Sequence, residues 1–138
     1  MLINISIAAL MLIGTSAIHG AAMTFAMYKW EFQNPDTVRA RTRLFWVSGT
    51  VLLMFLASVA EVLLWSVTYL ILNAIEGAEQ AFYFSMVTYT TLGYGDVLLD
   101  ERWRVLGSFE AANGIIMFGW TTAIVVAVVH RLYMRRDD

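Results

Sequence analysis

Long apolar stretches separated by short charged segments constrain this chain more than any other feature. Residues 1–28 contain no Lys, Arg, Asp or Glu, and residues 44–75 and 105–129 carry one acidic residue each. Each stretch is long enough to cross a bilayer as a helix, which takes about 20 apolar residues. The sequence therefore predicts an all-α membrane protein with spanning helices over residues 5–28, 44–75 and 105–129.

The composition excludes several other classes of protein. The chain is 59% hydrophobic and only 14% charged, which is too apolar for an ordinary soluble domain. It has no cysteine, and His19 and His130 are its only histidines, so a thiolate nucleophile and a histidine metal or haem centre are both excluded. No nucleophile is paired with a base. We therefore expect no enzyme, no resident cofactor, no nucleic-acid partner and no small-molecule substrate.

The placement of basic residues predicts how the chain crosses the membrane. The segment over residues 29–43 and the segment after residue 129 are both rich in Lys and Arg, which the positive-inside rule assigns to the cytoplasm. Both segments share one side only if there are three crossings, so we expect the N-terminus outside and the C-terminus inside. A signal peptide is the competing interpretation of residues 5–28, but the stretch lacks a basic region before it.

Within the first basic segment, Asn34 and Pro35 suit a helix start, with Asn34 as N-cap and proline at the first helical position. Residues 37–43 either lie along the membrane surface or form a solvated connector, and the sequence leaves both open.

A fourth apolar segment lies between the second and third predicted spans. Residues 80–95 are uncharged but too short to cross a bilayer, which indicates a re-entrant segment. We expect a short helix over residues 79–90, whose C-terminal end carries the negative end of the helix dipole. Gly93 and Gly95 follow that helix, and glycine enters positive φ at no steric cost. A backbone that alternates left- and right-handed conformations can point successive carbonyls at one axis.

The string Thr90-Thr91-Leu92-Gly93-Tyr94-Gly95-Asp96 resembles the selectivity-filter signature of tetrameric potassium channels, in which backbone carbonyls replace the hydration shell of the ion. A simple turn between two membrane helices is the alternative interpretation. The resemblance implies that the K⁺ ligands come from Thr91, Leu92, Gly93 and Tyr94. The residues expected to support this filter are Thr90, Gly95, Asp96, Ser85 and Thr88.

The resemblance extends beyond the filter. Residues 44–129 resemble the helix, pore loop and helix of the two-transmembrane ion-channel family, and the whole chain is similar to small bacterial channel-family proteins with one extra N-terminal helix. It implies a tetrameric potassium-channel pore fold, with one pore loop per chain supplying a quarter of the filter. We divide the chain into residues 1–43, an N-terminal helix with a basic linker, and residues 44–138, the pore domain.

The expected function is a potassium-selective pore subunit, a homotetramer in the bacterial cytoplasmic membrane. The alternative is a non-conducting or weakly selective membrane subunit or sensor that modifies another complex.

Departures from the family pattern concern the surroundings of the filter. Leu92 stands where Val is commoner, Leu99 replaces a familiar proline, and Tyr83, Phe84 and Val87 replace two tryptophans and a carboxylate that brace the filter.

The third predicted span carries a candidate hinge and gate. In the resembling channels the inner helix bends at the first glycine of a pattern matched here by Gly114 and Gly119. Beginning four residues after Gly114, residues spaced by four share one helix face, and the resemblance implies that this face points toward the pore axis. These candidate gate residues are Phe118, Thr122, Val126 and His130. Protonation of His130 is expected to repel its copies and favour opening, unless this histidine only snorkels to the interface.

Two acidic residues, Glu61 and Glu110, fall inside predicted spans, where function is the default hypothesis. The alternative is a protonated carboxyl hydrogen-bonded between helices. We expect at least one of them to be neutral and to brace the re-entrant helix through Ser85, Thr88 or Tyr89. His19, in the first span, is either a packing histidine or part of a proton relay.

Overall fold

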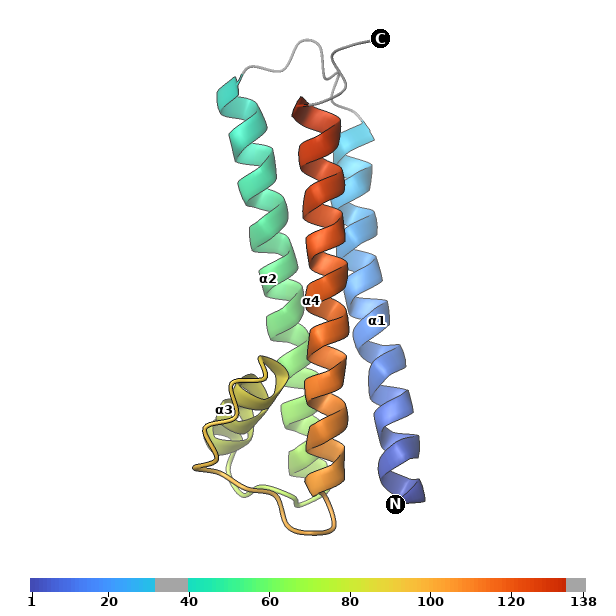
Figure 1. Ribbon diagram of the computed structural model, residues 1–138, viewed down its shortest axis with the longest axis vertical. Helices are drawn as coiled ribbons and strands as arrows, with labels where there is room; N and C mark the ends of the chain where they lie inside the picture. Colours follow the sequence, from blue (N-terminus) through green and yellow to red (C-terminus); the bar gives the residue numbers. More distant parts are fainter. Residues whose placement is uncertain (32–39, 134–138) are drawn as a thin grey trace.

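The computed structural model describes residues 1–31 and 40–133 as helices joined by loops (Figure 1). The long helices are α1 (Leu2–Glu31), α2 (Ala40–Ile71) and α4 (Arg104–Tyr133), and the short helix is α3 (Ala78–Tyr89). Three of them are long and apolar enough to span a membrane, over Leu2–Tyr28, Arg41–Ile71 and Arg104–Tyr133. The expected all-α membrane fold is therefore confirmed. The helix start predicted at Asn34 and residues 37–39 lie outside the described residues, whereas residues 40–43 form the first turn of α2.

The end of α2 differs from the prediction. The helix was expected to continue to residue 75, but it ends at Ile71. Asn73 has a φ of 48°, and the amides of Asn73 and Ala74 donate to the carbonyl oxygens of Leu70 and Tyr69. This pair of hydrogen bonds is a Schellman motif, which satisfies the last carbonyls of a helix and in which asparagine tolerates the left-handed position. Asn73 therefore stops α2 within an apolar run.

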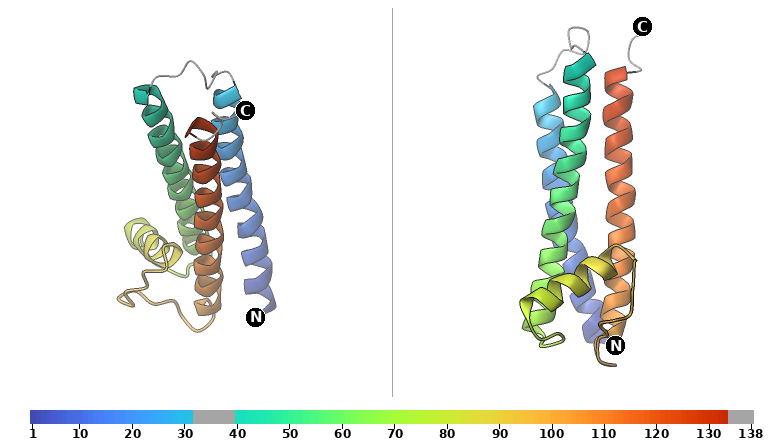
Figure 2. Two further views of the ribbon diagram at one scale, coloured as in Figure 1. Left: turned by 45° about the horizontal axis from the view of Figure 1, so that its top comes forward. Right: turned by 90° about the vertical axis from the view of Figure 1, so that its left-hand side faces the viewer.

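The three long helices run side by side, and α3 packs against one end of the bundle (Figures 1 and 2). The N-terminus lies at the same end as α3 and the loop that follows it. The start of α2 and the end of α4 lie at the opposite end. The relative arrangement matches the one expected from the basic segments.

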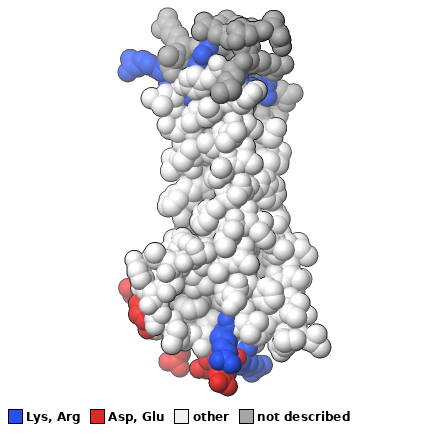
Figure 3. All heavy atoms as spheres, viewed as in Figure 1, with Lys and Arg blue, Asp and Glu red and all other residues white. Residues whose placement is uncertain are grey.

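Charged side chains gather at the two ends of the molecule (Figure 3). The end that carries α3 shows acidic and basic side chains, and the opposite end shows basic side chains. The band between them is free of charged side chains on the face drawn. This distribution is the one that a membrane-crossing bundle needs, because the hydrocarbon core disfavours exposed charge.

Helix α1 packs on the α2 and α4 of its own chain. Ala8 and Met11 of α1 belong to one buried cluster with Val62, Trp65 and Leu106. At Gly14 an added Cβ would lie 3.0 Å from Leu64 Cδ2, so the glycine permits a close approach of α1 to α2. Small residues commonly mark such contacts between membrane helices.

Candidate functional site

Helix α3 positions the loop that carries Gly93 and Gly95, which we call the glycine loop. It is preceded by Gly77, whose φ of 88° turns the chain into the helix. Its buried residues, Ala81, Ser85, Val87 and Tyr89, lie against α2 and α4. The helix lies at one end of the bundle and does not run along its whole length (Figure 2). The re-entrant helix predicted over residues 79–90 is thus present at Ala78–Tyr89.

The loop after α3 begins with a second Schellman-type cap. The amide of Thr91 donates to the Thr88 carbonyl oxygen (2.9 Å), and the amide of Leu92 donates to the Val87 carbonyl oxygen (2.9 Å). Thr91 sits at the left-handed position with a φ of 60°, which is costly for a β-branched residue. Thr90 stays at the helix end, where its hydroxyl donates to the Met86 carbonyl oxygen (2.7 Å).

Gly93 and Gly95 both have positive φ, at 57° and 76°. The sequence predicted left-handed backbone at these two positions, and that expectation is confirmed. A Cβ at either position would meet no atom within 4 Å, so the requirement for glycine is one of backbone conformation and not of space. The surrounding loop is open in a single chain, with Leu92 and Tyr94 exposed by 56% and 67%.

One hydrogen bond ties the loop back to α3. The Tyr83 hydroxyl donates to Asp96 Oδ2 over 2.7 Å. This bond lowers the pKa of Asp96 from its ordinary value and raises the pKa of Tyr83, because it stabilises the ionised carboxylate and holds the phenol proton. Tyr83, singled out in the sequence only as a departure from the family pattern, therefore braces the loop through Asp96.

Glu110 of α4 joins α3 to α2. It is fully buried, with Ser85 contacting Oε1 and the Tyr69 hydroxyl donating to Oε2 over 2.7 Å. The Ser85 hydroxyl also lies 3.1 Å from the Val62 carbonyl oxygen. Because Ser85 has a single hydroxyl hydrogen, a proton on Glu110 would let the carboxyl donate to Ser85 while Ser85 donates to Val62. The neutrality of Glu110 stays a prediction.

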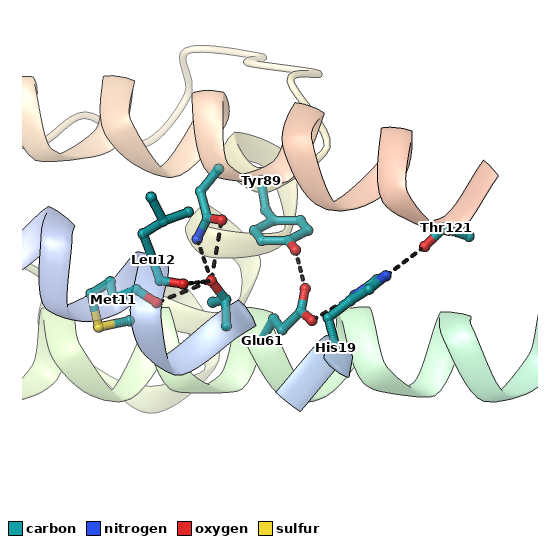
Figure 4. A network of polar contacts seen from close by, with 8 residues as sticks. Met11, Leu12, His19, Glu61, Tyr89 and Thr121 are labelled. Carbon is teal, nitrogen blue, oxygen red and sulfur yellow. Dashed lines mark hydrogen bonds and ion pairs between the residues drawn. The ribbon is translucent and has the colours of Figure 1, made fainter. Parts of the chain in front are cut away.

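Glu61 of α2 is the centre of a second buried set of contacts (Figure 4). Tyr89 at the end of α3 donates its hydroxyl to Glu61 Oε2, and His19 Nδ1 of α1 lies 2.9 Å from Glu61 Oε1. His19 Nε2 lies 3.1 Å from the Thr121 hydroxyl of α4. One residue from each of the four helices thus takes part, and the two ring nitrogens of His19 both have partners.

The contacts predicted from the acidic residues to Ser85 and Tyr89 are therefore present. Thr88, the third partner considered, makes no such contact; its side chain lies in the groove beside the loop. Two further polar contacts hold α1 in place. Asn113 Nδ2 donates to Thr15 Oγ1 over 3.0 Å, and Asn4 Nδ2 donates to the Arg102 carbonyl oxygen over 2.8 Å.

The glycine expected to act as a hinge has a packing role. Helix α4 continues without a break through Gly114 and Gly119. A Cβ on Gly114 would lie 1.9 Å from the Tyr89 carbonyl oxygen, whereas a Cβ on Gly119 would meet nothing within 4 Å. The backbone of α4 approaches the end of α3 at Gly114 so closely that only glycine fits. Bending at this point stays a prediction.

The candidate gate residues form an uncovered face of α4. Phe118, Thr122, Val126 and His130 are all exposed in the single chain. Phe118 lies at the end of this face nearest α3, in an edge-to-face contact with Tyr89 at a centroid distance of 5.7 Å. The face is thus adjacent to the end of α3 and is free to meet other copies of the chain.

Sequence reasoning missed several residues of this site. Tyr69, Thr121, Thr15, Asn113 and Asn4 make the buried polar contacts described above, and none was singled out as a partner. The available signal was their polarity within apolar spans, because a polar group in a bilayer needs a hydrogen-bond partner. Polarity identifies which residues need partners but not which partners they find.

Comparison with known proteins assigns the chain to a family. No curated protein and no solved structure matched it. A family model described as "Ion channel" matches residues 43–131, which is more than half of the chain. The match covers α3, the glycine loop and nearly all of α2 and α4. This multi-pass membrane protein, with its re-entrant helix and glycine loop, belongs to that ion-channel family.

Proposed function

We propose that this chain is the pore subunit of a homotetrameric, potassium-selective channel, and that residues Thr91, Leu92, Gly93 and Tyr94 coordinate K⁺. The observation that carries the proposal is the positive φ of Gly93 and Gly95 in an open loop directly after a re-entrant helix. Carbonyls of such a loop, brought together from several copies, replace the water around a dehydrated cation.

The neighbouring groups favour a cation. Helix α3 ends at Tyr89, and the negative end of its dipole lies beside the loop. Thr91 adds a hydroxyl oxygen at the base of the loop. At the mouth, acidic side chains outnumber the basic ones, and such a surface concentrates cations. These acidic residues are Glu76, Glu79, Asp96, Asp100 and Glu101, against Arg102 and Arg104.

One chain offers only part of such a pore. The loop's outer residues are exposed, and a groove of about 510 Å³ opens beside it. Loop residues Thr91 and Gly93, together with Thr88 of α3 and Gly107 and Ala111 of α4, are among those that line this groove. Three further copies arranged around a four-fold axis would cover the loop, and in our proposal Tyr94 then packs behind the filter.

We further propose that the α3 end of the bundle faces the outside of a bacterial cytoplasmic membrane. The basic residues at the opposite end support this orientation by the positive-inside rule. The uncovered α4 face with Phe118, Thr122, Val126 and His130 would line the inner half of the pore, with Val126 as its narrowest ring. Residues 1–43 then act as an added helix and linker on a pore domain of residues 44–138.

Flux measurements on purified protein in liposomes test the proposal. We expect K⁺ uptake by the wild-type protein and little Na⁺ uptake. Gly93→Ala should abolish uptake, because a Cβ at positive φ costs about 1 kcal/mol in each copy. Gly77→Ala is the matched control, since Gly77 also has positive φ, at 88°, but lies at the start of α3. This control should keep selective uptake.

The oligomeric state is measured on the same samples by light scattering in detergent. Selective uptake by Gly93→Ala would contradict the filter assignment. A wild-type tetramer that conducts neither ion would favour the alternative of a non-conducting subunit that modifies another membrane complex.

A further inference from the structure

A groove between α1 and α4 has the features of a lipid site. It lies toward the end of the bundle opposite α3, where basic side chains gather, and has a volume of about 270 Å³. Its walls are Met23 and Met27 on α1 and the small side chains of Ala123 and Ala127 on α4. Both pairs are spaced by four residues, so each pair lines one helix face. The methionines can adapt to an irregular apolar occupant.

The groove has a closed end and a charged end. Trp120 closes it toward the middle of the bundle and lies 5.2 Å, ring centre to ring centre, from His19. Arg131 stands at the other end. The rise of α4 from Trp120 to Arg131 is about 16 Å, close to half of the roughly 30 Å hydrocarbon core. The groove therefore matches the depth of one leaflet.

Arg131 has no acidic partner in the part of the chain that the structure describes. Among the side chains that the structure describes, over residues 1–28 and 41–133, the ion pairs are His19 with Glu61 and Glu101 with Arg104. None of the described residues that line the groove is a carboxylate. A half-buried guanidinium beside an apolar slot complements a phosphate attached to a hydrocarbon chain.

We propose that this groove binds an anionic phospholipid, with one acyl chain between Met27 and Ala127 and the headgroup phosphate on Arg131. A second groove provides an internal comparison. It lies between α1 and α2 and has a similar volume of about 260 Å³. The described residues that line it, such as Phe45, Gly49 and Leu53, include no charged side chain. That groove can hold apolar chains but cannot select a charged headgroup.

Native mass spectrometry of the full chain in detergent tests the proposal, with dioleoyl phosphatidylglycerol and dioleoyl phosphatidylcholine as probes. We expect the wild-type protein to retain phosphatidylglycerol about fivefold better, the factor that corresponds to ~1 kcal/mol for one basic side chain at the membrane surface. Arg131→Gln should abolish this preference, and Arg131→Lys should keep most of it. Arg41→Gln is the charge control, because Arg41 is exposed at the same end but outside the groove.

Ala127→Phe fills the groove and should remove one bound lipid per chain of either type. Gly49→Phe in the uncharged groove should leave the phosphatidylglycerol preference unchanged. The proposal is overturned if Arg131→Gln behaves like Arg41→Gln, or if Ala127→Phe retains as much phosphatidylglycerol as the wild type.

A second copy of the chain seated in the groove would also exclude lipid. Because the chain contains no cysteine, a mixture of Met27→Cys and Ala127→Cys chains can report that arrangement directly. A disulfide between the two kinds of chain would overturn the lipid proposal, whereas unlinked chains together with the expected lipid preference support it. The readouts concern binding only, so they stand whether or not the channel conducts potassium.

Discussion

At the scale of single residues, close approach explains Gly114. Its missing side chain makes room for the Tyr89 carbonyl oxygen, which would stand 1.9 Å from a Cβ. Backbone atoms cannot move aside as a flexible side chain can, so the contact between α3 and α4 depends on this glycine. Gly114 therefore has a structural role in this fold that is independent of any bending.

Replacing Gly114 by alanine is expected to destabilise the fold by ~1–3 kcal/mol per chain, the usual cost of overpacking. The measurement is the thermal unfolding midpoint in detergent. Gly119→Ala is the matched control, because its Cβ has free space and alanine favours a helix by about 1 kcal/mol. If Gly114→Ala unfolds at the wild-type temperature and changes only channel opening, bending is the main role of this glycine.

The bond between Tyr83 and Asp96 predicts a pH dependence. It lowers the pKa of Asp96 below its ordinary value of 3.8, so it stabilises the ionised form of the folded loop. The stabilisation is complete above pH 3.8 and is lost as the pH falls through the lowered pKa of Asp96. In Tyr83→Phe the pKa of Asp96 should return toward its ordinary value, as measured by carbon NMR of the carboxyl group.

Tyr94→Phe is the control for this titration, since Tyr94 loses the same hydroxyl but makes no bond to Asp96 in the structure. Identical Asp96 titrations in wild type and Tyr83→Phe would show that the bond contributes nothing to the loop in solution.

At the scale of helices, α1 is a full member of the bundle. Apolar surfaces drive helices together only weakly in lipid, so packing of small residues and interhelical hydrogen bonds carry much of the association. Helix α1 uses both, with Gly14 against Leu64 and with polar contacts from Asn4, Thr15 and His19. The His19 contact reaches Glu61 and, through it, Tyr89 at the end of α3.

Removal of the His19 ring is expected to destabilise the bundle. His19→Leu leaves Glu61 Oε1 and the Thr121 hydroxyl without their partner, at a cost of about 1–3 kcal/mol for a buried polar group. Unfolding by detergent titration measures this change, and Thr24→Ala is the control because Thr24 is exposed on α1 and bonds only its own helix. In a cycle with Glu61→Leu, additive effects of the two substitutions would mean that the buried pair does not couple α1 to α2.

The helices themselves were largely predictable, and their contacts were not. Span lengths follow from the bilayer thickness, so the three long helices and the re-entrant α3 could be expected from apolar runs alone. The end of α2 was missed because Asn73 acts through its backbone conformation within an apolar run. A second partner of Glu61 besides Tyr89 lies 42 residues away at His19, and no local pattern in one sequence encodes such a pairing.

At the scale of the whole molecule, the predictable part of the site is the part that depends on local backbone. The positive φ of Gly93 and Gly95 could be expected because only glycine adopts it freely. In the proposed tetramer the environment of this loop would depend on other copies of the chain, and in one chain Tyr94 remains 67% exposed. A single chain can therefore fix the shape of the loop, whereas the proposed pore would need several chains.

The uncovered face of α4 carries the last prediction, which concerns the assembled molecule. Its residues Phe118, Thr122, Val126 and His130 are exposed in one chain and would meet around the axis of a tetramer. A ring of Val126 side chains is apolar enough to exclude water, and a constriction of this kind can block ions without closing completely. Val126→Ser places four hydroxyls in that ring and should raise resting K⁺ flux severalfold.

Liposome flux at constant pH measures this effect. Val125→Ser is the matched control, because the same polar change one residue earlier points about 100° away around the helix. Adding Gly93→Ala to Val126→Ser should abolish the increase, since the extra flux has to pass the filter. An increase that survives Gly93→Ala would be a leak through a damaged bundle, and equal flux in Val126→Ser and Val125→Ser would remove Val126 from the gate.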